Sequence, residues 1–256
     1  MQIHLDKRDH IAIITMEGDN DLNIGVINDE FHQRVAEYRD DGDLWCCIIT
    51  GAGTRAFSAG GNLTGALRNG MGGIPNGFWE HHALTLPTGM PLWKPLIAAV
   101  NGHAVGAGLM LALACDIRIA SENATFSISE VKFGWPAGQG ALQRLPRAIP
   151  LGAAMEMVLT GDKIDAQRAY HWGLVNDVVS SDKLIDTALA LADRIAANPP
   201  LAVQAVKEAT YRSLELPFDQ GLRITNLLSA VARTTEDFKE ATSAYSEKRR
   251  GTFKRA

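Results

Sequence analysis

The spacing of apolar residues divides the chain into a first half of strands and helices and a second half of helices. Apolar and polar residues alternate over Ile3–Asp6 and Ile11–Met16 on either side of a charged turn, a pattern typical of a β-hairpin. Apolar residues three or four apart over Ile27–Arg39 predict a helix. Short apolar runs predict further strands at Trp45–Thr50, Leu96–Val100, Ile117–Ala120 and Thr125–Ile128.

Helical spacing dominates from Gln139 onward. The predicted helices cover residues 139–148, 151–159, 165–171, 182–197, 199–214, 218–232 and 235–248. Strand–helix units followed by a run of helices predict an α/β fold, with a core over residues 1–198 and a C-terminal helical region over 199–256.

The composition excludes several classes of protein. The 256 residues are 46% hydrophobic, which is enough for a sizeable core, and the net charge of −4 speaks against a nucleic-acid partner. Cys46, Cys47 and Cys115 are odd in number and form no Cys-x-x-Cys pair, so neither a disulfide framework nor a metal site is predicted.

The N-terminal residues are charged and alternating, and they lack the apolar core of a signal peptide. No apolar run reaches the roughly 20 residues needed to span a membrane. We therefore expect a cytoplasmic protein with no membrane partner.

Two segments rich in small residues, 56–63 and 101–110, are the candidates for chemistry. Small residues let a ligand approach the backbone, and the N–H groups at a helix N-terminus favour negative charge. Each segment could equally be a tight turn with close helix packing. Neither carries a phosphate fingerprint, because Leu111 breaks the G-x-G-x-x-G spacing and there is no Gly-Lys-Ser/Thr.

Taken together, the two segments resemble the crotonase family of enoyl-CoA hydratases and isomerases. Residues 56–63, AFSAGGNL, are similar to its first signature, A-F-[SC]-A-G-x-D-L, except that Asn62 replaces Asp. Residues 101–120 follow its second signature through Leu111, Ala112, Cys115, Asp116 and Ala120. The resemblance implies a spiral of stacked ββα units with a helical C-terminal trimerisation region.

The resemblance also implies the catalytic groups. The backbone N–H groups of Gly61 and Ala107 would bind the thioester oxygen, which gains charge in an enolate. Glu130 falls on one of two glutamate positions of the family's hydratases, and Met110 stands at the other. We expect Glu130 to transfer protons; the alternative is a surface glutamate, for example one paired with Lys132.

An enoyl-CoA hydratase/isomerase-type reaction is the leading expectation. With Met110 in place of a glutamate, a Δ3-Δ2 enoyl-CoA isomerase stays open, and so does a CoA-ester dehydratase, decarboxylase or hydrolase that uses His81 or His82. The non-enzyme alternative is a CoA-ester-binding protein with a lapsed site. The glycine-rich stretch 68–77 is either a loop over the site or a plain connector.

The resemblance implies an acyl-CoA thioester substrate and no separate cofactor, because coenzyme A is part of the substrate. The adenine pocket is expected around Leu22, Asn23, Ala56 and Ala59. In the basic C-terminal decapeptide, Phe253 could stack on adenine and Lys254 could meet the CoA phosphates, unless the tail only aids solubility. A homotrimer or homohexamer is expected. His103, Asp116 and Glu156 are interpreted as structural.

Overall fold

The computed structural model describes residues 2–18, 21–61 and 92–256. It begins with an antiparallel hairpin of β1 (Gln2–Arg8) and β2 (Ile11–Glu17), which confirms the predicted hairpin. Asp9 adopts a positive φ of 48° in the turn between them, a conformation that Asp tolerates better than most residues.

The larger sheet has six strands in the order β1-β2-β3-β5-β7-β10. From β2 onward, neighbouring strands run parallel. The remaining strands are β3 (Cys46–Gly51), β5 (Leu96–Val100), β7 (Ile117–Ser121) and β10 (Asp177–Val179). Because βαβ crossovers cover both faces of a parallel sheet, β3 and β5 are buried along their whole length. The apolar runs predicted β3, β5 and β7 to within a residue, whereas β10 was not predicted.

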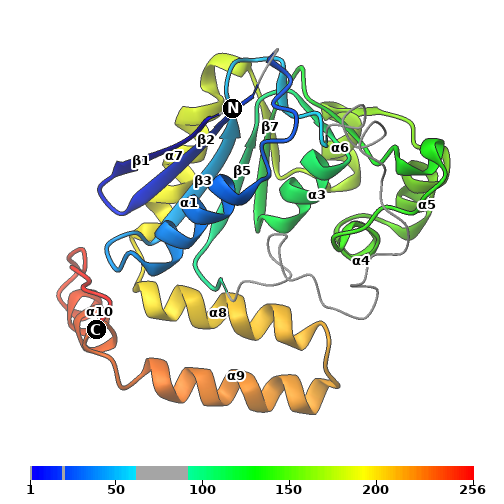
Figure 1. Cartoon of the computed structure of the whole chain (residues 1–256). Helices are drawn as coiled ribbons and strands as arrows, with labels where there is room; N and C mark the ends of the chain where they lie inside the picture. The colour runs from blue at the N-terminus through cyan, green and yellow to red at the C-terminus, as the bar shows by residue number, and fades with distance from the viewer. Residues whose placement is uncertain (1, 19–20, 62–91) are drawn as a thin grey trace.

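Helices cover both faces of this sheet (Figure 1). On one face, a row of isoleucines at Ile13, Ile48 and Ile97 packs with α7 (Leu184–Ala196). On the other face, α1 (Asp29–Asp40) buries Phe31, Val35 and Tyr38, the apolar stripe that its spacing predicted.

A second sheet, missed in the sequence as a sheet, has the order β4-β6-β8-β9. Its strands are β4 (Ala56–Ser58), β6 (His103–Val105), β8 (Thr125–Ser127) and β9 (Ile164–Asp165). Each of β4, β6 and β8 directly follows a strand of the large sheet, so the chain repeats a strand–strand unit that then leads to a helix or turn. This is the spiral of ββα units implied by the resemblance.

The helices of the second half match their predicted ranges within a few residues. They are α4 (Ala141–Ala148), α5 (Leu151–Thr160), α6 (Ala166–Trp172), α8 (Pro200–Ser213), α9 (Phe218–Ala232) and α10 (Glu236–Ser246). In Figure 1, α8 and α9 form a pair below the sheets, and α10 lies at one end of this pair. None of the helices in the described part of the chain is long and apolar enough to cross a membrane.

Candidate active site

The first predicted donor, Gly61, follows β4 in a loop that two backbone hydrogen bonds hold. The N–H of Ala59 donates to Leu22 O over 2.8 Å, and the N–H of Gly25 donates to Gly60 O over 2.9 Å. In a trans peptide the N–H points opposite to the preceding carbonyl. The N–H of Gly61 therefore points away from Gly25, and Gly61 itself is exposed.

The second predicted donor, Ala107, is the first residue of α3 (Ala107–Ala114). Gly106 O accepts the N–H of Met110 over 2.9 Å, so the N–H of Ala107 points the other way, out of the helix N-terminus. The N-cap residue Gly106 provides no side-chain hydrogen bond, and the first turn carries no acidic residue. This helix end therefore offers unpaired N–H groups to an anionic oxygen.

The two loops meet through glycines. A methyl group on Gly60 would lie 2.8 Å from Val105 O and 3.4 Å from Ala107 N, where it would cover the predicted donor. A methyl group on Gly108 would overlap the carbonyl oxygen of Ser58. Contact this close between backbones needs residues without a Cβ, which accounts for both small-residue segments and brings Gly61 and Ala107 to one place.

Asn23 holds the first loop from behind. Its side-chain Nδ2 donates to Ala56 O over 2.7 Å and to Ala52 O over 3.2 Å, and its Oδ1 accepts the N–H of Gly18. Asn23 and Ala56 are buried, and Leu22 and Ala59 are partly exposed. The four residues predicted to form the adenine pocket thus lie together next to Gly61, with Leu22 and Ala59 carrying the accessible surface. Their contact with CoA stays a prediction.

Glu130 is the first residue of a 3-10 turn, η2 (Glu130–Phe133), that follows β8. Its carboxylate packs against Gly106, because a methyl group there would lie 2.8 Å from Oε1. Burial raises the pKa of Glu130, and the backbone amides of Glu130 and Ser129 partly oppose that rise. Its Oε2 is buried without a hydrogen-bond partner among the described residues.

The ion pair between Glu130 and Lys132, given as one example of the surface alternative, is not formed. Lys132 instead binds Asp162 over 2.7 Å at the surface. Glu130 therefore has an available carboxylate beside the residue that precedes Ala107.

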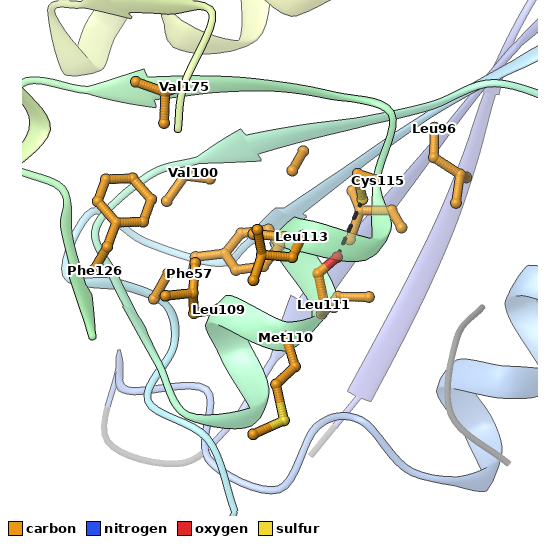
Figure 2. Packing of buried hydrophobic residues seen from close by; sticks show 14 of the residues in the cluster. Phe57, Leu96, Val100, Leu109, Met110, Leu111, Leu113, Cys115, Phe126 and Val175 are labelled. Atoms are coloured by element: carbon orange, nitrogen blue, oxygen red, sulfur yellow. Dashed lines mark hydrogen bonds between the residues drawn. The ribbon is translucent and has the colours of Figure 1, made fainter. Parts of the chain in front are cut away.

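Met110 lies three residues after Ala107, on the same face of α3, and is 6% exposed. Figure 2 shows its side chain leaving α3 on the side away from Phe57 and Leu109. A thioether thus stands at the position where the resemblance implies a second carboxylate. In the described part of the chain, no three His, Cys, Asp or Glu side chains form a group that could hold a metal ion.

Phe253 and Lys254 do not join this site within one chain. The tail folds back on α10, where the buried carboxylate of Asp237 accepts the N–H groups of Lys254 and Arg255, each over 2.8 Å. Figure 1 places the C-terminus at the end of the molecule opposite α4 and α5. His81, His82, Asn62 and the 68–77 stretch lie outside the described residues.

The three residues interpreted as structural have structural partners. His103 Nδ1 shares a 2.8 Å hydrogen bond with Thr125 Oγ1. Asp116 accepts the N–H of Leu96 over 2.7 Å and pairs with Lys207 over 2.8 Å. Glu156 forms a surface ion pair with a residue of α6, Arg168.

Arg118, whose side chain caps the C-terminal end of α3, was not identified from the sequence. Its guanidinium donates to Cys115 O over 2.8 Å, to Ala112 O over 3.3 Å and to Leu174 O over 2.6 Å. A basic residue shortly after a helix was the available signal, because cations favour the last turn.

Comparison with known proteins places these features in a family. The sequence model described as "Enoyl-CoA hydratase/isomerase" matches residues 6–256. The chain is 39% identical to (E)-benzylidenesuccinyl-CoA hydratase of Thauera aromatica over a 270-residue alignment that covers all of both chains. It is 40% identical over 222 residues to 2,3-dehydroadipyl-CoA hydratase of Escherichia coli, covering 84% of this chain and 82% of that one.

Solved structures of enoyl-CoA hydratases have the same fold as this chain. An enoyl-CoA hydratase from Bacillus anthracis superposes with a TM-score of 0.90 at 32% identity, and the match covers all of both chains. A second, from Mycobacterium tuberculosis, gives 0.88 at 35% identity over 99% of each chain. This chain, with its ββα spiral, belongs to the enoyl-CoA hydratase/isomerase family of enzymes.

Proposed function

We propose that the chain adds water to an enoyl-CoA thioester, or eliminates water from the corresponding 3-hydroxyacyl-CoA, with Glu130 as the proton carrier. One observation carries the proposal: the Glu130 carboxylate lies against Gly106, the residue directly before the predicted donor Ala107. The named relatives that act as CoA-ester hydratases or dehydratases support this reaction class.

The backbone donors supply the electrostatic part of the reaction. When an oxygen nucleophile adds to C3 of the enoyl group, electrons move onto the thioester oxygen. The N–H groups of Gly61 and Ala107 bind that oxygen more strongly as it gains charge. In other enzymes, one such donor lowers the activation barrier by roughly 3–4 kcal/mol.

Glu130 moves the proton. Its carboxylate accepts a proton from water while the water oxygen bonds to C3, and the resulting carboxylic acid then delivers that proton to C2 of the enolate. Elimination runs the same steps backward. A pKa raised by burial brings the two protonation states closer in energy near neutrality, as a group that both accepts and donates requires.

Met110 favours a second candidate, a Δ3-Δ2 enoyl-CoA isomerase. Isomerisation needs one base, which removes a proton from C2 and returns one to C4, and no second carboxylate is needed to hold water. Glu130 satisfies that requirement by itself.

A conservative substitution tests both candidates. Glu130→Gln keeps the shape and removes the ionisable group, so turnover should fall roughly 100- to 10,000-fold. Glu156→Gln, an exposed ion-paired glutamate, is the matched control and should retain activity. Unchanged turnover in Glu130→Gln with every CoA thioester assayed would rule out the single-carboxylate mechanism.

The choice between the two reactions follows from the products. The wild-type enzyme is incubated with a 2-enoyl-CoA and with a 3-enoyl-CoA of the same length, and the products are separated by chromatography. A 3-hydroxyacyl-CoA from the first substrate supports hydration. Conversion of the 3-enoyl thioester to a 2-enoyl thioester, without hydration, supports the isomerase.

We also propose that copies of the chain assemble as a homotrimer or homohexamer in the cytoplasm. Large apolar side chains are exposed along α8 and α9, with Phe218 87%, Val206 66% and Val231 66% accessible. Exposed apolar patches of this kind mark protein interfaces. Phe218→Asp should lower the mass measured by light scattering if these helices pack across subunits.

The C-terminal tail lies away from its own chain's site, so contact between Phe253 or Lys254 and CoA requires a neighbouring copy. Lys254→Gln should then raise the KM for a CoA thioester about two- to fivefold, the scale of one exposed charge pair. The same substrate attached to pantetheine lacks the nucleotide phosphates, and its KM should not change. Equal KM changes for both substrates would contradict a phosphate contact.

A further inference from the structure

Gly106 lies between two groups of the proposed site, the backbone N–H of Ala107 and the carboxylate of Glu130. It directly precedes Ala107 and caps the N-terminus of α3, and its N–H donates over 3.0 Å to Ser127 O in the strand before Glu130. Its backbone angles are φ 53° and ψ −119°. These angles match the first central position of a type II′ turn, which glycine favours.

A second observation is independent of the backbone angles. A methyl group on Gly106 would lie 2.8 Å from Glu130 Oε1 and 3.6 Å from the carboxyl carbon. The carboxylate thus occupies the space that a side chain at position 106 would fill. The oxygen therefore lies on the side of Gly106 that a Cβ would occupy.

We propose that Gly106 is a positioning residue that sets where the Glu130 carboxylate lies relative to the N–H of Ala107. This rests on the proposed role of Glu130 as proton carrier. The glycine acts through the missing side chain: it lets the carboxylate approach the loop whose next amide binds the thioester oxygen. Any Cβ at this position pushes the carboxylate outward, away from the reacting carbons.

Displacement of a proton carrier affects the chemical step more than it affects substrate binding. A shift of about 1 Å costs on the order of 100-fold in rate, because proton transfer depends steeply on geometry. Gly106→Ala should therefore lower kcat on that scale with a smaller change in KM. A displaced carboxylate is also better hydrated, so the acidic limb of the kcat profile should move to lower pH.

Gly106→Ala also strains the backbone, so a double-substitution cycle must separate strain from contact. Glu130→Asp shortens the side chain by one methylene and removes the clash with a Cβ at position 106. If the contact positions Glu130, the factor by which Glu130→Asp lowers kcat should be at least about threefold smaller in the Gly106→Ala background than in the wild type. Independent, multiplicative effects on kcat would overturn the proposal.

Gly134 provides the control for strain. It has φ 87° at the end of η2, and a methyl group there meets no atom within 4 Å. Gly134→Ala should lower the melting temperature and leave the pH profile of kcat unchanged. A pH shift equal to that of Gly106→Ala would assign the effect to strain and overturn the proposal.

A measurement without substitution at 106 covers the case in which Gly106→Ala does not fold. In protein labelled with [13C]glycine, the Gly106 Hα resonances should titrate with Glu130 and lose that titration in Glu130→Gln. No titration at Gly106 would overturn the contact. The proposed function fails differently, through full turnover in Glu130→Gln, so the two failures are distinguishable.

Discussion

The two ends of α3 differ in whether side chains satisfy their backbone groups. At its C-terminus, the guanidinium of Arg118 donates to Ala112 O and Cys115 O, so the helix carbonyls have charged partners. At its N-terminus, Gly106 gives no side-chain cap and no acidic residue balances the helix dipole. A capping side chain there typically adds about 1 kcal/mol of stability. The N-terminus of α3 lacks this stabilisation, and its N–H groups are left available to an oxygen atom of a ligand.

The largest expected effect comes from separating the two loops at the open end. Gly108→Ala places a methyl group onto Ser58 O, with backbone on both sides, so the loops must move apart. We expect kcat/KM to fall at least about 100-fold, as for loss of one oxyanion donor. Steady-state assays measure this.

Gly152→Ala in α5 is the matched control, because a methyl group there meets nothing within 4 Å. It should be neutral for activity and should stabilise the helix by about 0.5–1 kcal/mol. Full activity in Gly108→Ala would show that the open end does not depend on this contact.

At the closed end, Arg118→Leu should act on stability instead. Removing the guanidinium leaves the carbonyls of Cys115 and Leu174 without their donor, which we expect to cost about 2–3 kcal/mol. Urea unfolding measures the loss. Arg147→Leu removes a similar bond to a carbonyl at the surface and should cost under about 0.5 kcal/mol. A large drop in kcat for folded Arg118→Leu would contradict the idea that the C-terminal end of α3 contributes to stability and not to activity.

Adding a carboxylate at the open end should change the pH dependence of the reaction. Met110→Glu places a second acid on the face of Ala107, and a like charge raises the pKa of Glu130 further. Since the base form of Glu130 is needed for hydration, the acidic limb of kcat/KM should move up by roughly one pH unit. Met110→Gln has the same shape without charge and should leave the limb in place. A limb that stays fixed in Met110→Glu would place position 110 outside the range of Glu130.

The smallest expected effect concerns stability at the open end. Burial raises the pKa of Glu130 in the folded state, so the folded protein holds this proton more tightly than the unfolded chain does. Its ionisation therefore destabilises the fold as pH rises through the raised pKa, and this cost vanishes below the ordinary glutamate pKa.

Glu130→Gln should consequently raise the melting temperature by at most a few degrees at pH 8, and by nothing near pH 4. Glu156→Gln should show no such dependence. A gain in Glu130→Gln that is equal at both pH values would contradict burial as its cause.

The sequence predicted the helices and the large sheet well, because their signal is local. Apolar spacing over 182–197 and 218–232 was enough to place α7 and α9 within two residues. The small sheet was missed, and its first strand, β4 (Ala56–Ser58), was not predicted as a strand. Strands of two or three residues carry no periodicity, and pairing across distant segments fixes them.

The candidate site was predictable in its residues but not in its contacts. Resemblance pointed to Gly61, Ala107 and Glu130, and the structure brings their loops together. The packing of Glu130 against Gly106 could not be read from the sequence, because it depends on a single backbone conformation and a side-chain direction. The hydrogen bonds of Arg118 likewise depend on carbonyls from two segments that are distant in sequence, the end of α3 and Leu174.

Because both predicted donors are main-chain groups, the thioester pocket is largely indifferent to which side chain stands at 61 or 107. Ala107 already occupies a position where the family signature has glycine. The residues proposed to determine the reaction, Met110 and Glu130, would by contrast act through side chains that a single substitution can replace. Under the proposed function, the backbone keeps the means of stabilising an enolate, and two side chains determine what the enolate becomes.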